Sequence, residues 1–429
     1  MNILILTNTF TPHVGGVARS VEAFSAEYRK RGHRVLVVAP EFPDMSLDEV
    51  DVVRINAIQN FNASDFSVAL PIHPQLTDSI DAFRADIVHS QHPFLLGITA
   101  LRLARHRGLP LVFTHHTLYD QYTHYVPGDS SALKRFATEL ATRYANLCDQ
   151  VFAPSESIQA LLQQRGVTTP IAVVPTGVRL ENFAQGDGPA FRRQMGIPET
   201  AFVVGHLGRL APEKNLEFLT QAVTDFIGRN SRAYFLVIGT GPSENAIRDT
   251  FARAGIESQL HLAGILQQQP LADALHAMDV FAFASTSETQ GMVLTEAMAA
   301  GLPVVALDAP GAREVVSDRL NGRLLMEASS ATFGAALAWV AGLAPEQLRD
   351  VQQAALATAA AFSIPRSADK SLACYAALES KSTIFDANRD EHGWEDVMTF
   401  IETEWNILKT MARASDAALG THLFPEQGD

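Results

Sequence analysis

The feature that most constrains the fold is a regular alternation of short β-branched runs with longer amphipathic stretches. This alternation predicts parallel sheets built from strand–helix–strand units. In the first half we expect strands at Ile3–Leu6, Val35–Val38, Ile87–His89, Leu111–Phe113, Gln150–Ala153 and Ala172–Val174. After the turn-rich stretch Pro175–Pro189 the pattern begins again, with expected strands at Phe202–His206, Tyr234–Ile238, His261–Ala263, Val280–Ala282 and Pro303–Ala306.

These runs are hydrophobic throughout, so helices should cover both faces of each sheet. A chain of 429 residues also exceeds what one ordinary core accommodates. We therefore predict an α/β protein with two Rossmann-like, doubly wound parallel-sheet domains that face a cleft. The expected parts are an N-terminal domain (1–180), a C-terminal domain (181–363), a C-terminal helix (364–380) that packs back toward the N-terminal domain, and an acidic helical tail (381–429).

The tail carries 4 Lys and Arg against 10 Asp and Glu. It contains one expected helix, from about Trp394 to Ala414. Apolar residues at spacings of three and four would give this helix one apolar face; they are Val397, Phe400, Ile401, Trp405 and Leu408. We expect that face to pack on the body of the protein, in preference to a partner or a membrane.

Composition excludes several classes of function. A net charge of −14 disfavours binding to nucleic acid, which requires many phosphate-neutralising cations. Cys148 and Cys374 are far apart and lack CxxC spacing, so neither a disulfide framework nor a zinc site is expected. The chain shows no signal-peptide pattern and no apolar run long enough to cross a membrane. A cytoplasmic location fits these observations best.

Two carboxylates flank the expected start of a helix in the stretch from Ser287 to Ala306. Glu288 would lie in the loop before the helix and Glu296 inside it, roughly 8 Å apart along the axis. The amides at the helix start, near Gly291, lie between them. A carboxylate at each end could bind a diol while the amides bind a diphosphate, which suits a nucleotide sugar. Taken alone, acidic residues near a helix start are more often only favourable with the helix dipole.

A second motif, Gly208–Asn215, follows an expected strand and places Arg209 and Lys214 at its carboxyl end, where open α/β sheets bind ligands. Two cations there match the negative charge of a diphosphate. The glycine-rich turn Gly239–Pro242 follows the next strand. Close approach to a phosphate and a plain tight turn explain it equally well.

In the first half, Gly15 and Gly16 open an expected helix after the first strand. The spacing is not the GxGxxG fingerprint, and Pro40 stands where a dinucleotide-binding enzyme has an acidic residue, so a nicotinamide enzyme is disfavoured. The glycine pair is either a structural turn or a loop that contacts the donor phosphate or the acceptor.

Histidines cluster after two expected strands of the first half, at His89, His92, His115, His116 and His124. They lack metal-binding spacing and a carboxylate partner, so no metal is expected. A neutral imidazole at the end of a strand could instead bond a sugar hydroxyl. His116 is the choice for that role, with Tyr119 and Asp120 as acceptor-side candidates together with Gly15.

Taken together, these motifs resemble the retaining glycosyltransferases of the GT-B fold with an E-x7-E motif, glycosyltransferase family 4. The likeness covers roughly residues 1–380 and rests on Gly15–Val17, Phe113–His116, GRLAPEKN, Glu288 with Glu296, EAMAAGLPVV and GAREVV. It implies that Arg209 and Lys214 hold the diphosphate, Glu296 the ribose and Glu288 the transferred sugar, with His116 near the reacting carbon. The expected donor site comprises Gly16, Arg209, Lys214, Glu288, Thr289, Gln290, Gly291, Met292, Val293 and Glu296.

The stretch HHTLYDQYTHYVP looks most like the bacterial diacylglycerol glucosyltransferases. That likeness implies a lipid acceptor, UDP-glucose as co-substrate, and no cofactor. An expected helix, Ser131–Ala145, could present Lys134, Arg135 and Arg143 to anionic headgroups at the inner face of a membrane, and Leu133, Phe136 and Leu140 to acyl chains. A core helix with a charged outer face explains the pattern equally well. The acidic tail lies outside the family pattern, and long polybasic clusters are missing.

The resulting prediction is a retaining, metal-independent hexosyltransferase in which the leaving diphosphate accepts the proton of the acceptor hydroxyl. Arg209, Lys214 and the helix start at Gly291 would stabilise the departing charge. Three alternatives stay open: transfer to a soluble or polysaccharide acceptor, a non-catalytic nucleotide-sugar-binding protein, and an epimerase that acts on the nucleotide sugar itself.

Overall fold

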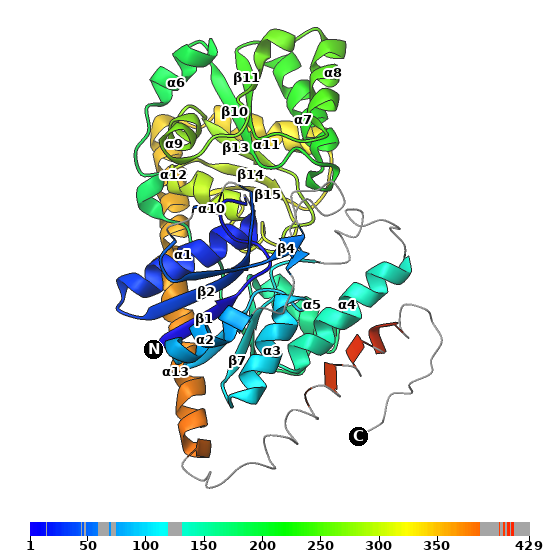
Figure 1. Ribbon diagram of the computed structural model, residues 1–429. Helices are drawn as coiled ribbons and strands as arrows, with labels where there is room; N and C mark the ends of the chain where they lie inside the picture. The colour runs from blue at the N-terminus through cyan, green and yellow to red at the C-terminus, as the bar shows by residue number, and fades with distance from the viewer. Residues whose placement is uncertain are drawn as a thin grey trace. The chain divides into compact units, whose positions relative to one another are not determined.

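The computed structural model describes residues 1–13, 15–43, 45–46, 49–58, 68–69, 74–118, 131–386, 403, 406–407, 410–411 and 413–415. Within it the chain forms two compact units (Figure 1). Unit 1 comprises Met1–Thr176 and Ser367–Asp429, and unit 2 comprises Gly177–Arg366. Each unit is built around its own parallel sheet.

In the described part of unit 1, seven strands form a parallel sheet in the order β3-β2-β1-β6-β7-β8-β9. The strands are β1 (Asn2–Leu6), β2 (Arg34–Pro40), β3 (Val52–Ile55), β6 (Ile87–Ser90), β7 (Leu111–Thr114), β8 (Gln150–Ala153) and β9 (Ile171–Val173). A separate antiparallel pair joins β4 (Ala57–Ile58) to β5 (Val68–Ala69). The order reverses between β1 and β6, because β2 and β3 lie on one side of β1 and the later strands on the other.

Helices cover both faces of this sheet. They are α1 (Gly16–Lys30), α2 (Pro74–Phe83), α3 (Leu96–His106), α4 (Ser131–Asn146), α5 (Glu156–Gln164) and α13 (Ile364–Asp386). Successive side chains of a strand point to opposite faces of the sheet. Alternate residues of β1 therefore pack in different cores. Ile3 and Ile5 pack with residues of α1 and α13, whereas Leu4 and Leu6 share a core with residues of α2, α3, α4 and α5.

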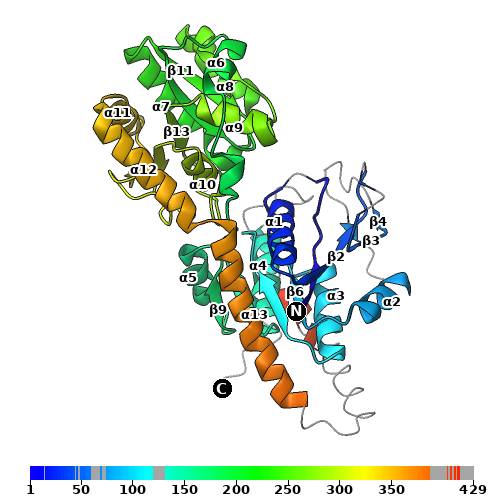
Figure 2. The same ribbon diagram turned by 90° about the vertical axis from the view of Figure 1, so that its left-hand side faces the viewer.

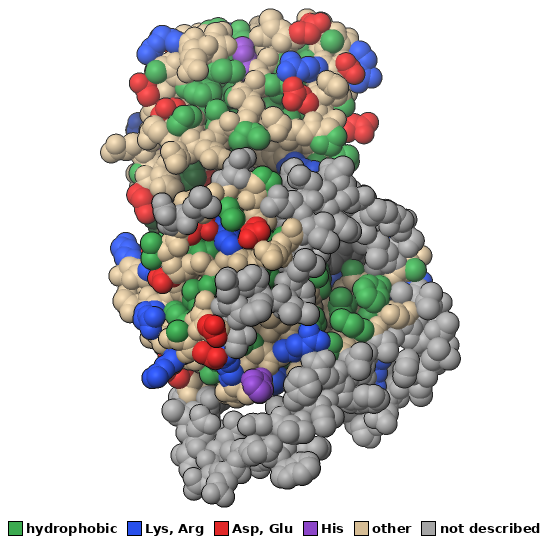
Figure 3. Space-filling model, viewed as in Figure 1, with side chains coloured by type: hydrophobic (Ala, Val, Ile, Leu, Met, Phe, Trp, Pro, Cys, Tyr) green, Lys and Arg blue, Asp and Glu red, His purple; other side chains and the backbone are tan. Residues whose placement is uncertain are grey.

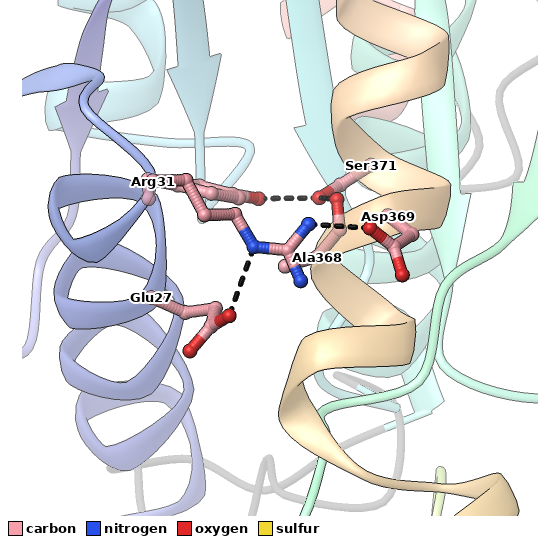
Figure 4. Close-up of polar contacts among 6 residues, drawn as sticks. Glu27, Arg31, Ala368, Asp369 and Ser371 are labelled. Carbon is pink, nitrogen blue, oxygen red and sulfur yellow. Dashed lines mark hydrogen bonds and ion pairs between the residues drawn. The ribbon is translucent and has the colours of Figure 1, made fainter.

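The C-terminal helix α13 is joined to unit 1 by a set of polar contacts with α1. Figure 4 shows Arg31 between Glu27, at 2.8 Å, and Asp369 of α13. Beside them the hydroxyl of Tyr28 lies 2.6 Å from that of Ser371, which is completely buried. Figure 2 shows α13 running along the side of unit 1. From Ser367 onward the helix therefore belongs to unit 1, and it extends beyond the predicted segment 364–380.

In unit 2, a parallel sheet of six strands has the order β12-β11-β10-β13-β14-β15. The strands are β10 (Phe202–Leu207), β11 (Ala233–Ile238), β12 (Leu260–Leu262), β13 (Val280–Phe283), β14 (Val304–Leu307) and β15 (Gly322–Leu325). One core contains residues of α6 (Gly188–Met195), α9 (Gln268–His276), α10 (Met292–Ala299) and α12 (Pro345–Ala361). The other contains residues of α7 (Leu216–Arg229), α8 (Glu244–Ala254) and α11 (Ser330–Ala341). The prediction of two doubly wound parallel sheets is confirmed.

Every predicted strand is present, but the antiparallel pair of β4 and β5 was missed, and so were two edge strands of the parallel sheets. β3 (VVRI) and β15 (GRLL) each carry an arginine and are only partly buried. An edge strand has a neighbour on one side alone, so its sequence does not show the continuous apolar run that marks a central strand.

The described positions of the acidic tail are helical, and four of them are buried at spacings of four, three and four: Thr403, Ile407, Thr410 and Ala414. Ile407 joins a core of unit 1, so one face of this helix packs on the body of the protein. The predicted apolar face, Val397, Phe400, Ile401, Trp405 and Leu408, lies outside the described residues.

None of the described helices combines the length and apolar character that crossing a membrane requires. On the face shown in Figure 3, basic and acidic side chains are intermingled over each unit, so the described residues form no continuous basic surface there.

Candidate functional site

The loops that follow β10 and β13 flank the point in unit 2 where the strand order reverses. From β10 the chain moves outward to β11 and β12, then returns to the other side of β10 to form β13. Open α/β sheets bind ligands at the carboxyl ends of the strands at such a point. Both motifs singled out in the second half of the sequence therefore lie at the place where this topology favours a ligand.

Lys214 and Glu288 meet at this switch point. Lys214 ends the short 3₁₀ turn Pro212–Lys214 after β10, and Glu288 lies in the loop after β13. The Nζ atom of Lys214 lies 2.6 Å from Oε1 of Glu288, and the two side chains are 17% and 18% exposed. The sequence assigned the two residues to one site from their chemistry, and the structure brings them into contact.

Two further hydrogen bonds join the same two loops. The side-chain amide of Asn215 donates to the carbonyl oxygen of Ala284 at 3.2 Å, and the hydroxyl of Ser287 donates to that of Glu213 at 2.9 Å. Asn215 has a φ of 54°, a left-handed conformation that asparagine tolerates better than most residues. Sequence reasoning missed both bonds. The only signal for them is that each donor stands next to a residue already singled out.

The helix that follows Glu288 begins at a left-handed glycine. Gly291 has a φ of 69° and precedes the first turn of α10. Its loop rests on a second one: a Cβ atom at Gly311 would lie 2.7 Å from the carbonyl carbon of Gln290. The amide of Gly311 donates to Oε2 of Glu314 at 2.7 Å. The GAREVV motif therefore supports the loop that carries Glu288, a role the sequence did not reveal.

The other predicted donor-site residues of unit 2 lie on the same loops and helix. Arg209 lies two residues after the end of β10 and is exposed. Glu296, in the second turn of α10, is 7% exposed, and Gln290 is 6% exposed. Partly buried positions complete the set: Thr289, Met292 and Val293. All of them lie at the carboxyl edge of the sheet.

Packing accounts for the glycine-rich turn after β11. A Cβ atom at Gly239, where φ is 128°, would lie 1.9 Å from the carbonyl oxygen of Gly208. The amide of Leu210 donates to the carbonyl of Thr240 at 2.9 Å. This turn therefore contacts the backbone on both sides of Arg209, and its glycine is required for that close approach.

In unit 1, His116 follows β7, and its Nε2 atom lies 2.7 Å from Oε1 of Gln91, which follows β6. Because an amide oxygen only accepts, Nε2 carries the proton and Nδ1 is the acceptor atom of the ring. Burial, followed by the charges of neighbouring histidines, lowers the pKa of His116 well below its usual value. A lowered pKa favours the neutral form of the ring. Gln91, which sets its tautomer, was missed.

The neighbouring histidines have structural partners. His89 bonds Thr114 through Nε2 at 2.7 Å and Tyr375 through Nδ1 at 2.6 Å. Nδ1 of His92 accepts the amide of Asn8 at 3.1 Å. Within the described parts of the chain, no group of three or more His, Cys, Asp or Glu side chains is placed to hold a metal ion.

The remaining candidates of the first half are placed as follows. Gly15 is the extended residue before α1, and Gly16 is the first residue of that helix, as expected. Tyr119, Asp120 and His124 lie outside the described residues. In α4, Leu140 is buried, which favours the alternative of a core helix with a charged outer face. Lys134 and Arg135 are exposed on the same helix, which therefore has a charged outer face.

Comparison with known proteins identifies related enzymes. The sequence model described as Glycosyltransferase Family 4 matches residues 14–182, and that described as Glycosyl transferases group 1 matches residues 201–342. An alpha-monoglucosyldiacylglycerol synthase of Streptococcus pneumoniae is 28% identical over 76% of this chain and 75% of its own length. A GDP-mannose-dependent alpha-mannosyltransferase of Mycobacterium tuberculosis is 30% identical over 76% of this chain and 84% of its own.

Among solved structures, that of Anabaena HepE in complex with UDP is similar to this chain with a TM-score of 0.70. The similarity covers 88% of this chain and 100% of the other, at 22% identity. At that identity the likeness shows a common fold.

Proposed function

Because the chain belongs to glycosyltransferase family 4 and has the GT-B fold, we propose that it transfers glucose from UDP-glucose to the hydroxyl of a diacylglycerol-type lipid. Glycosyltransferase activity follows from its relatives. We propose four further details: the donor, the acceptor, retention of anomeric configuration and independence of metal ions.

The observation that carries the proposal is the contact between Lys214 and Glu288 beside the start of α10. A lysine supplies positive charge for a diphosphate, the first amides of α10 supply hydrogen-bond donors, and a carboxylate accepts hydrogen bonds from sugar hydroxyls. These three groups occur within two loops at the switch point of unit 2. They match the parts of a nucleoside diphosphate sugar.

In the proposed reaction, the bond between the anomeric carbon and the diphosphate breaks while the acceptor oxygen forms its bond on the same face of the sugar. The departing diphosphate oxygen takes the proton of the acceptor hydroxyl, so no protein nucleophile is required. Arg209, Lys214 and the amides of α10 stabilise the charge that develops on the diphosphate. His116 keeps the role that the family resemblance assigns to it, contact with the sugar through a neutral imidazole.

The lipid acceptor is supported by the names of two relatives. The alpha-monoglucosyldiacylglycerol synthases of Streptococcus pneumoniae and Acholeplasma laidlawii are 28% and 26% identical to this chain. Exposed Lys134 and Arg135 on α4 could bring unit 1 to an anionic membrane surface, each basic residue adding about 1 kcal/mol near such a surface. The protein would then bind from the cytoplasmic side.

GDP-mannose is the second candidate donor, since a mannosyltransferase that depends on it is 30% identical. The test incubates the purified protein with UDP-glucose or GDP-mannose and with vesicles that contain diacylglycerol. We expect an α-glucosyl lipid, identified by NMR, from UDP-glucose alone. A mannolipid formed from GDP-mannose would show that GDP-mannose is the donor. A product formed only with soluble sugars would show that the acceptor is not a lipid. A new nucleotide sugar formed without acceptor would indicate an epimerase.

A further inference from the structure

We propose that Glu288 is an internal competitor of the diphosphate for Lys214, so that the site binds a complete nucleotide sugar in preference to the bare nucleoside diphosphate left after transfer. This inference rests on the proposed function, because it assumes that Lys214 binds a diphosphate. It assigns to Glu288 a role in product release, beyond its contact with the transferred sugar.

The first step is the ion pair itself. The Nζ atom of Lys214 lies 2.6 Å from Oε1 of Glu288, and both side chains are more than four-fifths buried. Solvent screens a pair at this depth much less than a pair on the surface. Removal of one partner leaves the other charge poorly compensated. A diphosphate that approaches Lys214 therefore meets a cation that is already bonded to a carboxylate.

The second step is that the loops hold this pair in place. Residues next to each partner are bonded across to the opposite loop, Asn215 to the carbonyl of Ala284 and Ser287 to the carbonyl of Glu213. Because these bonds hold the two loops together, little additional backbone entropy is lost when Lys214 and Glu288 meet, and the main entropy cost is the ordering of their side chains. The pair is therefore expected to form again whenever the site empties.

The third step compares the two ligands. A nucleotide sugar draws Lys214 toward its diphosphate, but its sugar hydroxyls donate hydrogen bonds to Glu288 and compensate the carboxylate. A bare nucleoside diphosphate has no such hydroxyls, and its terminal phosphate carries additional negative charge. Glu288 then both repels the phosphate and competes with it for Lys214. Loss of the sugar thus lowers the affinity of the site for the remaining nucleotide.

The test measures the affinity of the full chain for UDP and for UDP-glucose by titration calorimetry. In Glu288→Gln we expect UDP to bind about three- to tenfold more tightly than in the wild type, while UDP-glucose gains less or binds more weakly. Glu288→Ala should show the same direction. In a Lys214→Met background the substitution Glu288→Gln should raise UDP affinity by less than it does with the lysine present, because only the direct repulsion between Glu288 and the phosphate is then removed.

Glu199→Gln is the matched control. It removes the same charge from unit 2, but from an exposed pair with Arg193 that precedes β10, at the end of the strand opposite the site. Unchanged UDP affinity in this variant shows that net charge alone does not explain the gain.

If UDP binds Glu288→Gln and Glu288→Ala no more tightly than the wild type, the inference is wrong while the proposed function stands. If the wild type binds neither UDP nor UDP-glucose, the proposed function is wrong, and the inference is overturned with it.

Discussion

The hydroxyl of Tyr375 lies 2.6 Å from Nδ1 of His89, so the C-terminal helix is bonded to the end of a central strand of unit 1. Nε2 of the same ring lies 2.7 Å from the hydroxyl of Thr114 on the neighbouring strand. Both nitrogen atoms of His89 are thereby engaged, and the ring is 6% exposed. Two elements that lie 286 residues apart in the sequence are joined through one buried imidazole.

Replacing Tyr375 with phenylalanine should destabilise unit 1. The change removes the partner of a buried nitrogen atom, which typically costs about 1–3 kcal/mol. Urea unfolding followed through unit 1 should show a lower midpoint. Tyr234→Phe, in β11 of unit 2, is the matched control and should leave that midpoint unchanged. Equal midpoints for Tyr375→Phe and the wild type would show that the bond to His89 contributes no net stability.

Unit 1 should lose stability in mild acid. Burial lowers the pKa of His89 and of His92 from 6.5 to about 3. The unfolded chain therefore binds protons below pH 6.5 that the folded protein excludes, so stability is complete above that pH and falls as the pH drops toward 3. At pH 5 each ring should reduce the free energy of unfolding by about 2 kcal/mol.

Urea unfolding at neutral pH and at pH 5 measures this loss. His92→Asn offers an acceptor to the amide of Asn8 without a titrating ring, so its loss between the two pH values should be smaller. An equal loss in this variant and in the wild type would assign the acid sensitivity to other groups.

Gly311→Ala should disturb the donor loop. The new methyl group would lie 2.7 Å from the carbonyl carbon of Gln290, and the φ of 85° is unfavourable for alanine. We expect a higher KM for the donor and a lower melting temperature. Gly301→Ala is a matched control, since its φ is 78° but its nearest neighbour, Leu356, lies 3.9 Å away. Similar backbone strain should therefore lower its stability without changing the donor KM.

A donor KM raised equally in both variants would show that backbone strain, and not the close approach to Gln290, is responsible.

Sequence alone predicted the central strands because they are apolar on both faces, and it predicted Lys214 and Glu288 because their charges suit a nucleotide sugar. It could not predict Asn215, Ser287 or Gln91, whose roles depend on which atom lies opposite in the folded chain. These contacts depend on the tertiary structure, since no local sequence pattern encodes the hydrogen-bond partner of a polar side chain.

The face of α4 shows the same limit. The spacing of Phe136 and Leu140 fits an acyl-facing helix and a core helix equally well. Only the position of α4 against the sheet of unit 1 decides that Leu140 is buried.

Transfer by the wild-type protein should proceed in excess EDTA at the same rate as without the chelator. The proposal assigns neutralisation of the leaving diphosphate to Arg209, Lys214 and the first amides of α10, groups that take the place of a divalent cation. The measurement compares initial rates after chelation and after chelation followed by Mg²⁺ or Mn²⁺. A rate that collapses in EDTA and recovers with either metal would contradict a metal-independent reaction.

Arg209→Ala should lower turnover more than donor affinity. Arg209 lies two residues after the end of β10, at the switch point. We propose that it stabilises the negative charge that grows on the diphosphate as the sugar departs. Loss of one such preorganised group typically costs about 10²–10³-fold in rate. Steady-state kinetics should therefore show a large fall in kcat with a modest change in KM.

Arg193→Ala, which removes an exposed arginine of unit 2 before β10, should leave both constants unchanged. If Arg209→Ala raises KM alone and turns over at the wild-type rate, the guanidinium contributes to binding in the ground state only. Stabilisation of the leaving group would then rest on Lys214 and the helix start.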